Sequence, residues 1–438
     1  MKLRVSNFTR IKQAEIEIDG ITVIAGENNT GKSTIGKILF SLFNSMNNID
    51  EKIDRERKKQ IRNYNFGILR NYSIHENIFD TINPLSNKMI TFNRMANNLA
   101  KKLLQQSDFS YEVINSMVCD FLRKNYIGDE DGQIEELANN ISKHAISRIK
   151  LPNSVLAQEI ISRFFVNIFN NQINCKCMQN KDSDALLELA IKNKVNTVSF
   201  NNNICNNYEA QYSVLHEAFY IDNPFIIDEI TENADFDENT IKEHILSKLS
   251  SNDGIMDGIF DAVNAKEKLV DIYAILNKVV KGTIISNNDG FGLKIGNLSD
   301  PIKLSNLSTG LKSFVIIKML LEKGILKEKD VLILDEPEIH LHPEWQIIYA
   351  EIIVLLQKLF DLSIVVTTHS LNFLEAIEFF SEKHSINQKS RYYLAKSDGE
   401  MSIFEDVTND TSKIYSQMIQ ASILLDNLKY EMGNNDNE

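Results

Sequence analysis

The stretch that decides the fold lies near the N-terminus and reads ITVIAGENNTGKST over residues 21–34. Its first five residues are almost wholly apolar, which is typical of a central strand buried on both faces. Residues 26–33 fit the pattern G-x-x-x-x-G-K-[ST], and we expect a helix to begin near Lys32. A strand, a glycine-containing loop and a helix in this order predict a polyphosphate-binding loop.

The residue types in this loop suit a phosphate group. Gly26 and Gly31 let the backbone turn its N–H groups inward, and the N-terminus of the following helix adds its dipole. Lys32 is expected to reach the β- and γ-phosphates, and Ser33 to hold Mg²⁺. The sequence therefore predicts a site for a nucleotide polyphosphate with its metal ion.

A second motif ends an apolar strand in two carboxylates. Residues 331–334 are Val-Leu-Ile-Leu, and Asp335 and Glu336 follow directly. We expect Asp335 to bind Mg²⁺, directly or through water, and Glu336 to polarise the attacking water as a general base. Together with the phosphate loop, this pair predicts hydrolysis of the nucleotide.

Two further motifs offer groups for a γ-phosphate. Thr367-Thr368-His369-Ser370 follows another apolar strand, where His369 can hydrogen-bond the phosphate and sense its loss. In residues 304–312, LSNLSTGLK, Ser308 and Gly310 begin a helix and form a second anion site. One nucleotide does not need two such sites, so we expect this one to bind the nucleotide of a second copy.

Composition excludes several classes of protein. The chain has 438 residues, with 60 acidic and 47 basic side chains and a net charge of −13, which disfavours a basic coat for nucleic acid. No apolar run approaches the roughly 20 residues of a membrane span, and the N-terminus lacks a signal core. Four cysteines do not form a disulfide framework. We expect a cytoplasmic protein with no membrane partner.

Periodicity divides the chain into a predicted α/β core and insertions. The motifs fall in residues 1–45 and 286–400, which we expect to form that core. The remaining parts are a helical insertion over 46–183, a β lobe over 184–225, a helical arm over 226–285, and a C-terminal strand and helix over 401–438.

The four motifs, in this order, resemble those of the ABC-type ATPases. The phrase DEPEIHLHP at residues 335–343 is similar to the AAA-labelled branch that contains OLD-type and related anti-phage ATPases, and Asn7-Phe8 is similar to SMC-type heads. The resemblance covers about half of the chain and implies an ABC-type P-loop ATPase head with a β lobe and two helical insertions. It also implies ATP and Mg²⁺ as cofactors.

Site residues follow from matching positions. Asp335 and Glu336 would be the Mg²⁺ carboxylate and the catalytic base, His369 the switch, and residues 338–342 the D-loop at a dimer interface. The family's ATP-binding loop corresponds to Gly26, Glu27, Asn28, Asn29, Thr30, Gly31, Lys32, Ser33 and Thr34, with Ser33 also on Mg²⁺. Its signature, acting on the partner's nucleotide, corresponds to Ser308, Thr309 and Gly310.

One family residue has no counterpart. Family members carry a glutamine, in contact with Mg²⁺ and the water, near the place where this chain has Asp222 and Asn223. Either residue is a candidate replacement. The signature also has Thr309 and Leu311 where transporter-type members usually have Gly and Gln, which argues against a transporter.

The resemblance implies an ATP-driven sensor or scaffold in a bacterial anti-phage system of Septu or PARIS type. Its expected partners are a second copy of itself, in a head-to-head dimer or larger homo-oligomer, and a separate effector such as a nuclease. The alternatives are an SMC-like DNA-repair ATPase and a structural subunit whose assembly ATP stabilises. Residues 52–62, rich in Lys and Arg, leave nucleic acid or an acidic partner open, although a solvated helix face with internal i,i+4 pairs is the favoured explanation.

Overall fold

The computed structural model describes residues 1–75, 85–125, 131–176, 183–230, 239–250, 269–287, 290–296 and 298–435. The described chain divides into two units, one of residues 1–47 with 161–438 and one of residues 48–160. None of its helices is long and apolar enough to cross a membrane.

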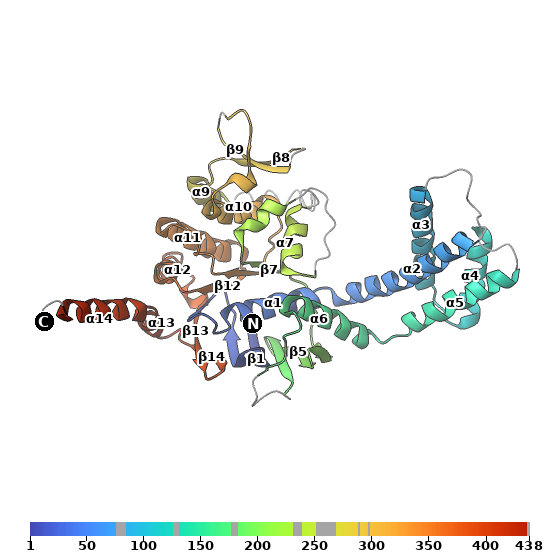
Figure 1. Cartoon of the computed structure of the whole chain (residues 1–438), viewed down its shortest axis with the longest axis horizontal. Coiled ribbons are helices and arrows are strands. Elements are labelled where there is room, and N and C mark those ends of the chain that lie inside the picture. The colour runs from blue at the N-terminus through green and yellow to red at the C-terminus, as the bar shows by residue number, and fades with distance from the viewer. Residues whose placement is uncertain are drawn as a thin grey trace. The chain divides into compact units, whose positions relative to one another are not determined.

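The first unit is built on a sheet whose described strands follow the order β6-β5-β4-β1-β2-β14-β13-β3-β12-β11-β7 (Figure 1). The strands β7, β11, β12, β3 and β13 are parallel, and β1, β2, β4, β5 and β6 pair antiparallel beside them. The sheet comprises β1 (Lys2–Phe8), β2 (Ile11–Glu17), β3 (Ile21–Gly26), β4 (Ala185–Ile191), β5 (Lys194–Asn201), β6 (Ile204–Glu209), β7 (Ala218–Ile221), β11 (Val331–Asp335), β12 (Ser363–Thr368), β13 (Ser390–Asp398) and β14 (Met401–Asp406). The predicted α/β class is confirmed.

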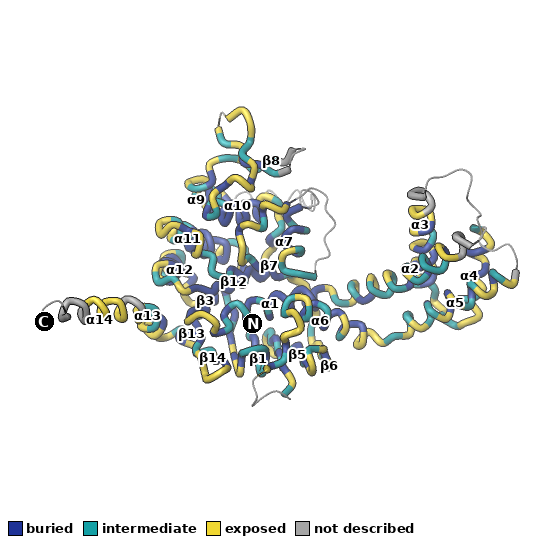
Figure 2. Tube along the Cα trace, in the orientation of Figure 1, coloured by how far each residue is buried: buried dark blue, intermediate teal, exposed yellow. Residues whose placement is uncertain are grey.

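The apolar strands lie between two hydrophobic layers. Along β11, Leu332 and Leu334 join one buried cluster, whereas Val331 and Ile333 join another. Successive side chains of a strand point to opposite faces, so the two clusters cover the two faces of the sheet. This is why these strands read as continuous apolar runs, and why they are dark blue in Figure 2.

Helices cover both faces of the parallel strands. Helix α1 (Lys32–Met46) belongs to one cluster, and α10 (Thr309–Glu322), α11 (Pro343–Phe360) and α12 (Leu371–Lys383) belong to the other. Gly36 allows helix α1 to pack closely against the sheet. A Cβ at this position would lie 2.8 Å from the Ile333 side chain and 2.9 Å from the Tyr220 ring. The contact fixes the helix that follows the predicted phosphate loop directly against the sheet.

The remaining elements of this unit are short. A small sheet contains β8 (Thr283–Asn287), β9 (Gly290–Lys294) and β10 (Ile302–Lys303). The other described helices are α7 (Ile241–Ser250), α9 (Val270–Val279), α13 (Ser412–Met418) and α14 (Gln420–Asn435), with 3-10 helices η2 (Pro224–Glu229), η4 (Leu304–Asn306) and η5 (Asn387–Lys389).

The arm expected over residues 226–285 needs correction. Within its described part, α7 and α9 bury Leu246, Leu249, Ile272 and Leu276 in the same cluster as α10 and α11. Their apolar faces complete the core of the first unit, so these helices do not form a separate arm. Residues 231–238 and 251–268 of this segment lie outside the description.

The second unit is helical, as expected for an insertion. Its helices are α2 (Ile49–His75), α3 (Leu85–Leu104), α4 (Tyr111–Lys124), α5 (Asp131–Ile149) and the first part of α6 (Asn153–Phe169). They enclose their own core, which includes Ile61, Leu99, Leu122 and Ile141. The last turns of α6 belong to the first unit, where Phe165 packs 6.0 Å from the Phe8 ring.

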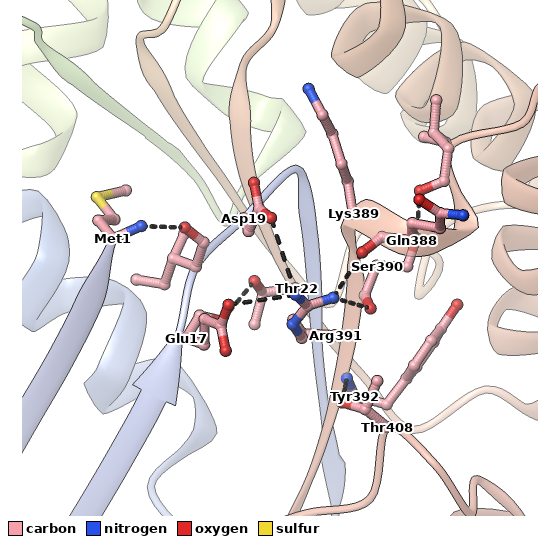
Figure 3. Close-up of polar contacts among 12 residues, drawn as sticks. Met1, Glu17, Asp19, Thr22, Gln388, Lys389, Ser390, Arg391, Tyr392 and Thr408 are labelled. Carbon is pink, nitrogen blue, oxygen red and sulfur yellow. Dashed lines mark hydrogen bonds and ion pairs between the residues drawn. The ribbon is translucent and has the colours of Figure 1, made fainter. Parts of the chain in front are cut away.

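Polar side chains at the amino ends of β3 and β13 are paired with one another (Figure 3). The Arg391 guanidinium lies 3.2 Å from a Glu17 carboxylate oxygen and 3.8 Å from Asp19. It also donates hydrogen bonds to the carbonyl oxygens of Gln388 at 2.8 Å and Ser390 at 3.1 Å. The arginine thereby ties the segment that leads into β3 to the segment that leads into β13.

Candidate functional site

The loop between β3 and α1 has the backbone that its glycines predicted. Gly26 has a φ of 147°, and a Cβ there would lie 2.4 Å from the Ala395 carbonyl oxygen. Asn29 and Gly31 also have positive φ, at 65° and 86°. Side chains rarely tolerate these conformations, and they turn successive N–H groups toward one side. The loop is therefore shaped to receive an anion.

Lys32 folds its side chain back across this loop. Its amine donates to the carbonyl oxygens of Gly26 at 3.0 Å and Glu27 at 2.8 Å, and only 4% of the residue is exposed. Burial lowers the pKa of this amine, while Glu336 and the neighbouring carboxylates act in the opposite direction. The amine also lies 3.9 Å from Glu336 Oε1, which brings the two motifs together.

The first turn of α1 carries the remaining loop residues. Ser33 and Thr34 are partly exposed there, and no acidic residue occupies this turn. No acidic side chain of this turn therefore neutralises the partial positive charge of the helix N-terminus. A phosphate placed here would receive this charge together with that of Lys32.

Two hydroxyls hold the Asp335 carboxylate at the carboxyl end of β11. Tyr220, on the neighbouring strand β7, donates to Oδ2 at 2.7 Å, and Thr367, at the end of β12, donates to Oδ1. Tyr220 is buried, and burial followed by the charge of Asp335 raises its pKa well above the usual range. Its proton therefore stays in place, and the carboxylate is oriented before any ligand arrives. Nothing in the sequence motif points to Tyr220.

Glu336 and His369 lie side by side. Glu336 has a φ of 50°, held by hydrogen bonds from its N–H to the carbonyl and hydroxyl oxygens of Thr367. Its Oε1 lies 3.2 Å from Nδ1 of His369, whose side chain is 44% exposed. A non-glycine residue in the left-handed region costs energy, and such strain concentrates at functional sites. The predicted base and the predicted switch thus form one pair.

Glu338 connects the D-loop to the switch, a role that sequence reasoning missed. Its Oε1 accepts hydrogen bonds from the Thr368 hydroxyl at 2.5 Å and from the His369 N–H at 3.1 Å. The residue is 3% exposed, and burial raises its pKa even though these bonds oppose the shift. Its Oε2 has no partner among the described residues. The sequence showed only a third acidic residue after the strand.

The structure separates the two candidates for the missing glutamine. The Asn223 side chain accepts a hydrogen bond from the Phe225 N–H at 2.9 Å and caps η2. Asp222 follows β7 beside β11, and burial raises its pKa, with Asp335 adding to the shift and Lys37 opposing it. Of the two candidates, Asp222 is therefore the one on whose pKa the Asp335 carboxylate acts.

The signature residues lie at the start of α10, where the Ser308 hydroxyl does not cap the helix. Ser308 is exposed at the N-cap and makes no side-chain cap. A Cβ at Gly310 would lie 2.9 Å from the His340 carbonyl oxygen and 3.2 Å from the Trp345 ring, so only glycine fits this close contact with the D-loop. Among the described residues, neither Ser308 nor Thr309 hydrogen-bonds the phosphate loop through its side chain.

The oxygen groups near the loop suit Mg²⁺. Asp335, Asp222 and the Ser33 hydroxyl are hard oxygen donors, which Mg²⁺ prefers, and nucleotide phosphates usually complete its shell. Among the described residues no group of three or more His, Cys, Asp or Glu side chains could hold a metal ion on its own. The donor set therefore fits a metal that arrives with a nucleotide rather than one held by a protein cage.

One family model and several solved structures are similar to this chain. The family model described as AAA ATPase domain matches residues 1–374. Among solved structures, the SMC head domain from Thermotoga maritima is similar with a TM-score of 0.39 and 12% identity, over 93% of this chain and 98% of that chain. An Smc head with an extended coiled coil, bound to the C-terminal domain of ScpA from Pyrococcus furiosus, gives a TM-score of 0.40 and 12% identity, over 96% and 98%.

Proposed function

The chain belongs to the AAA ATPase domain family, and from this premise we propose that it binds ATP with Mg²⁺ and hydrolyses it to ADP and phosphate. One observation carries the proposal. Lys32, the pair Asp335 and Glu336, and His369 come from three separate segments and converge at the carboxyl ends of adjacent parallel strands.

We propose a part in the reaction for each residue. The backbone of residues 26–31 and the Lys32 amine bind the phosphates, and Ser33, Asp335 and Asp222 supply oxygens for Mg²⁺, which neutralises charge on the β- and γ-phosphates when bound. Glu336 accepts a proton from the attacking water. His369 hydrogen-bonds the γ-phosphate, and Glu338 holds the His369 backbone so that the ring stays beside Glu336.

The signature site completes the proposal through a second copy of the chain. The exposed Ser308 hydroxyl and the N-terminus of α10 form an anion site that the copy's own nucleotide does not use. We place it on the γ-phosphate bound by the partner copy, so that ATP holds two heads together and hydrolysis releases them.

Light scattering with and without ATP and Mg²⁺ tests this mechanism. Glu336→Gln should bind ATP without hydrolysing it and should form a nucleotide-dependent dimer or larger assembly. Adding Ser308→Arg should abolish that change, whereas Ser305→Arg, at an exposed serine three residues earlier, should not. A protein that stays monomeric in every nucleotide state would contradict the role of the signature.

At the level of biology, we propose a sensor or scaffold in bacterial anti-phage defence that controls a separate effector, a nuclease for example. The form of the DEPEIHLHP phrase supports this role. Phage plating on cells that carry the chain with its neighbouring genes, compared with Lys32→Ala, tests it. Equal plaque numbers, together with hydrolysis that DNA stimulates, would instead favour an SMC-like repair ATPase. Assembly on ATP without turnover would favour a structural subunit.

A further inference from the structure

A cavity in the second unit is unrelated to the nucleotide site. It has a volume of about 680 Å³, which lies within the range of pockets that hold a ligand or several side chains. It opens where α2 meets the loop between α3 and α4 and the linker between α5 and α6. Its lining residues are Asp54, Arg55, Arg57, Lys58, Lys101, Leu104, Gln105, Phe109, Ile149, Leu151, Pro152 and Asn153.

Arg57 fixes one wall of this cavity. Its guanidinium donates to the Leu151 carbonyl oxygen at 2.8 Å and to the Asn153 side chain at 2.6 Å, and another of its nitrogens lies 3.7 Å from Asp54. These bonds tie the linker between α5 and α6 to α2. The wall is therefore held in place before a ligand binds, which reduces the entropy that binding would cost.

The cations on the rim are available to a ligand. Among the residues that the structure describes, Lys58 and Lys101 have no carboxylate within ion-pair distance, and Asp54 is the one acidic residue of the lining. Arg55 pairs with Glu51 at 3.3 Å, but both side chains are largely exposed, so a ligand can displace this pair at little cost. The cavity is thus locally positive in a chain whose net charge is −13.

The rest of the lining is apolar. Leu104, Phe109, Ile149, Leu151 and Pro152 contribute this surface. A free inorganic anion would use the cations and leave the apolar part in contact with water. A ligand that fills the cavity therefore combines negative charge with an apolar group.

We propose that this cavity binds an acidic segment of a partner protein, with one apolar or aromatic side chain seated against Phe109 and carboxylates facing Lys58 and Lys101. A single-stranded nucleic acid fits less well, because it needs a basic track with several aromatic stacking partners, and Phe109 is the one aromatic residue of the lining. The acidic chain as a whole would also repel a long polyanion.

Fluorescence anisotropy with the full chain tests the proposal. The probe is a short fluorescein-labelled peptide with glutamates on both sides of a single phenylalanine. The comparison probes are the same peptide with alanine for phenylalanine, a lysine version, and a labelled oligothymidine. We expect the glutamate–phenylalanine peptide to bind most tightly and to lose affinity as salt is raised.

Paired variants localise the binding. Lys58→Glu with Lys101→Glu should weaken the peptide about tenfold or more, because two attractive charges become repulsive. Phe109→Ala should weaken it and remove the preference for phenylalanine over alanine. Lys59→Glu, on the same helix but outside the lining, should leave affinity nearly unchanged. ATP binding should be equal in all variants, so failure here is distinguishable from failure of the ATPase proposal.

Three results would overturn the inference. The first is that no acidic peptide binds at the salt of the cell. The second is that binding survives the double charge reversal in a protein with an unchanged circular dichroism spectrum. The third is that oligothymidine binds through Lys58 and Lys101 while the peptide does not, which would assign the cavity to nucleic acid.

Discussion

The two ends of the parallel strands differ in how their charged side chains are paired. At the carboxyl ends, Lys32, Asp335, Glu336 and Glu338 lie close together, Glu336 has a positive φ, and the Oε2 of Glu338 has no partner among the described residues. At the amino ends, Arg391 makes four polar contacts with Glu17, Asp19 and the backbone (Figure 3).

The amino ends repeat this pattern on β7 and β11. Asp330 accepts hydrogen bonds from the N–H groups of Glu217 at 3.2 Å and Lys327 at 2.9 Å. Glu217 in turn lies 2.7 Å from Lys248 and 3.6 Å from His244. One end of the sheet therefore pairs its charges internally and favours stability. At the other end the charged groups contact one another and neighbouring hydroxyl groups, except for the Oε2 of Glu338, which has no partner among the described residues.

The variant with the largest expected effect is Lys32→Ala, at the carboxyl end of the strands. Without this amine, ATP affinity should fall about 100-fold or more, because a charge-assisted contact to the phosphates is lost. The midpoint of thermal unfolding without nucleotide should change little. Titration with a fluorescent ATP analogue measures the affinity, and calorimetry measures the midpoint of thermal unfolding. Lys12→Ala, at an exposed ion pair with Asp398, is the control that should affect neither.

Glu338 offers a second test at the same end. Glu338→Ala should lower kcat about tenfold or more with little change in KM, because the His369 backbone loses its acceptor. Glu338→Gln should keep most activity, since its amide oxygen accepts the same bonds. Burial raises the pKa of Glu338, so the charged form is penalised in the folded protein and the neutral amide should not reduce stability at pH 7. A kcat unchanged in the alanine variant would remove Glu338 from the mechanism.

Arg391→Ala should give the reverse outcome at the amino end. The free energy of unfolding should fall by about 1–2 kcal/mol, because two backbone carbonyls and Glu17 lose their donor. ATP affinity should be unchanged. Lys389→Ala, which removes an exposed pair with Asp361, should cost much less in the same urea titration. Loss of ATP binding in Arg391→Ala would show that the two ends are not independent.

The smallest effect concerns acid stability. Burial opposes ionisation of Glu217, but hydrogen bonds from His244 and Lys248 outweigh it and lower its pKa to about 2. A lowered pKa stabilises the fold above the unfolded value of about 4.5, and this contribution is lost as the pH falls toward 2. The difference in unfolding free energy between wild type and Glu217→Gln should therefore shrink between pH 6 and pH 3. A difference independent of pH would exclude this role.

The parts of the fold with the strongest local signal were predictable from sequence. The apolar runs leading into Gly26, Asp335 and Thr368 are strands, and the helix expected at Lys32 begins there. Each of these strands is buried on both faces, so its sequence is a continuous apolar run that is easy to recognise. The contacts of Lys32 and His369 with Glu336 bring three of the sequence motifs together, whereas the catalytic roles stay predictions.

The weak elements were harder to predict. Strand β6, ICNNYE, has the polar sequence of a turn because it is an edge strand held by β5 and half of its residues are exposed. Strand β7 begins at Ala218, and the apolar Val214 before it forms an isolated bridge to Asn47. The helices α7 and α9 look like an arm in sequence, and only their packing against α10 and α11 shows that they belong to the core.

The sequence by itself determined the phosphate loop, the carboxylate pair, the histidine that follows β12 and the α/β class. These features depend on residue types at fixed short spacings, which a linear pattern records. Tertiary structure alone decided that Tyr220 orients Asp335 and that Glu338 holds the His369 backbone. It also decided that Asn223 caps η2, whereas the charge of Asp335 acts on Asp222. It also decided that Lys58 and Lys101 line the same cavity. Such contacts join residues distant in sequence, and only the packing of the strands and helices brings them together.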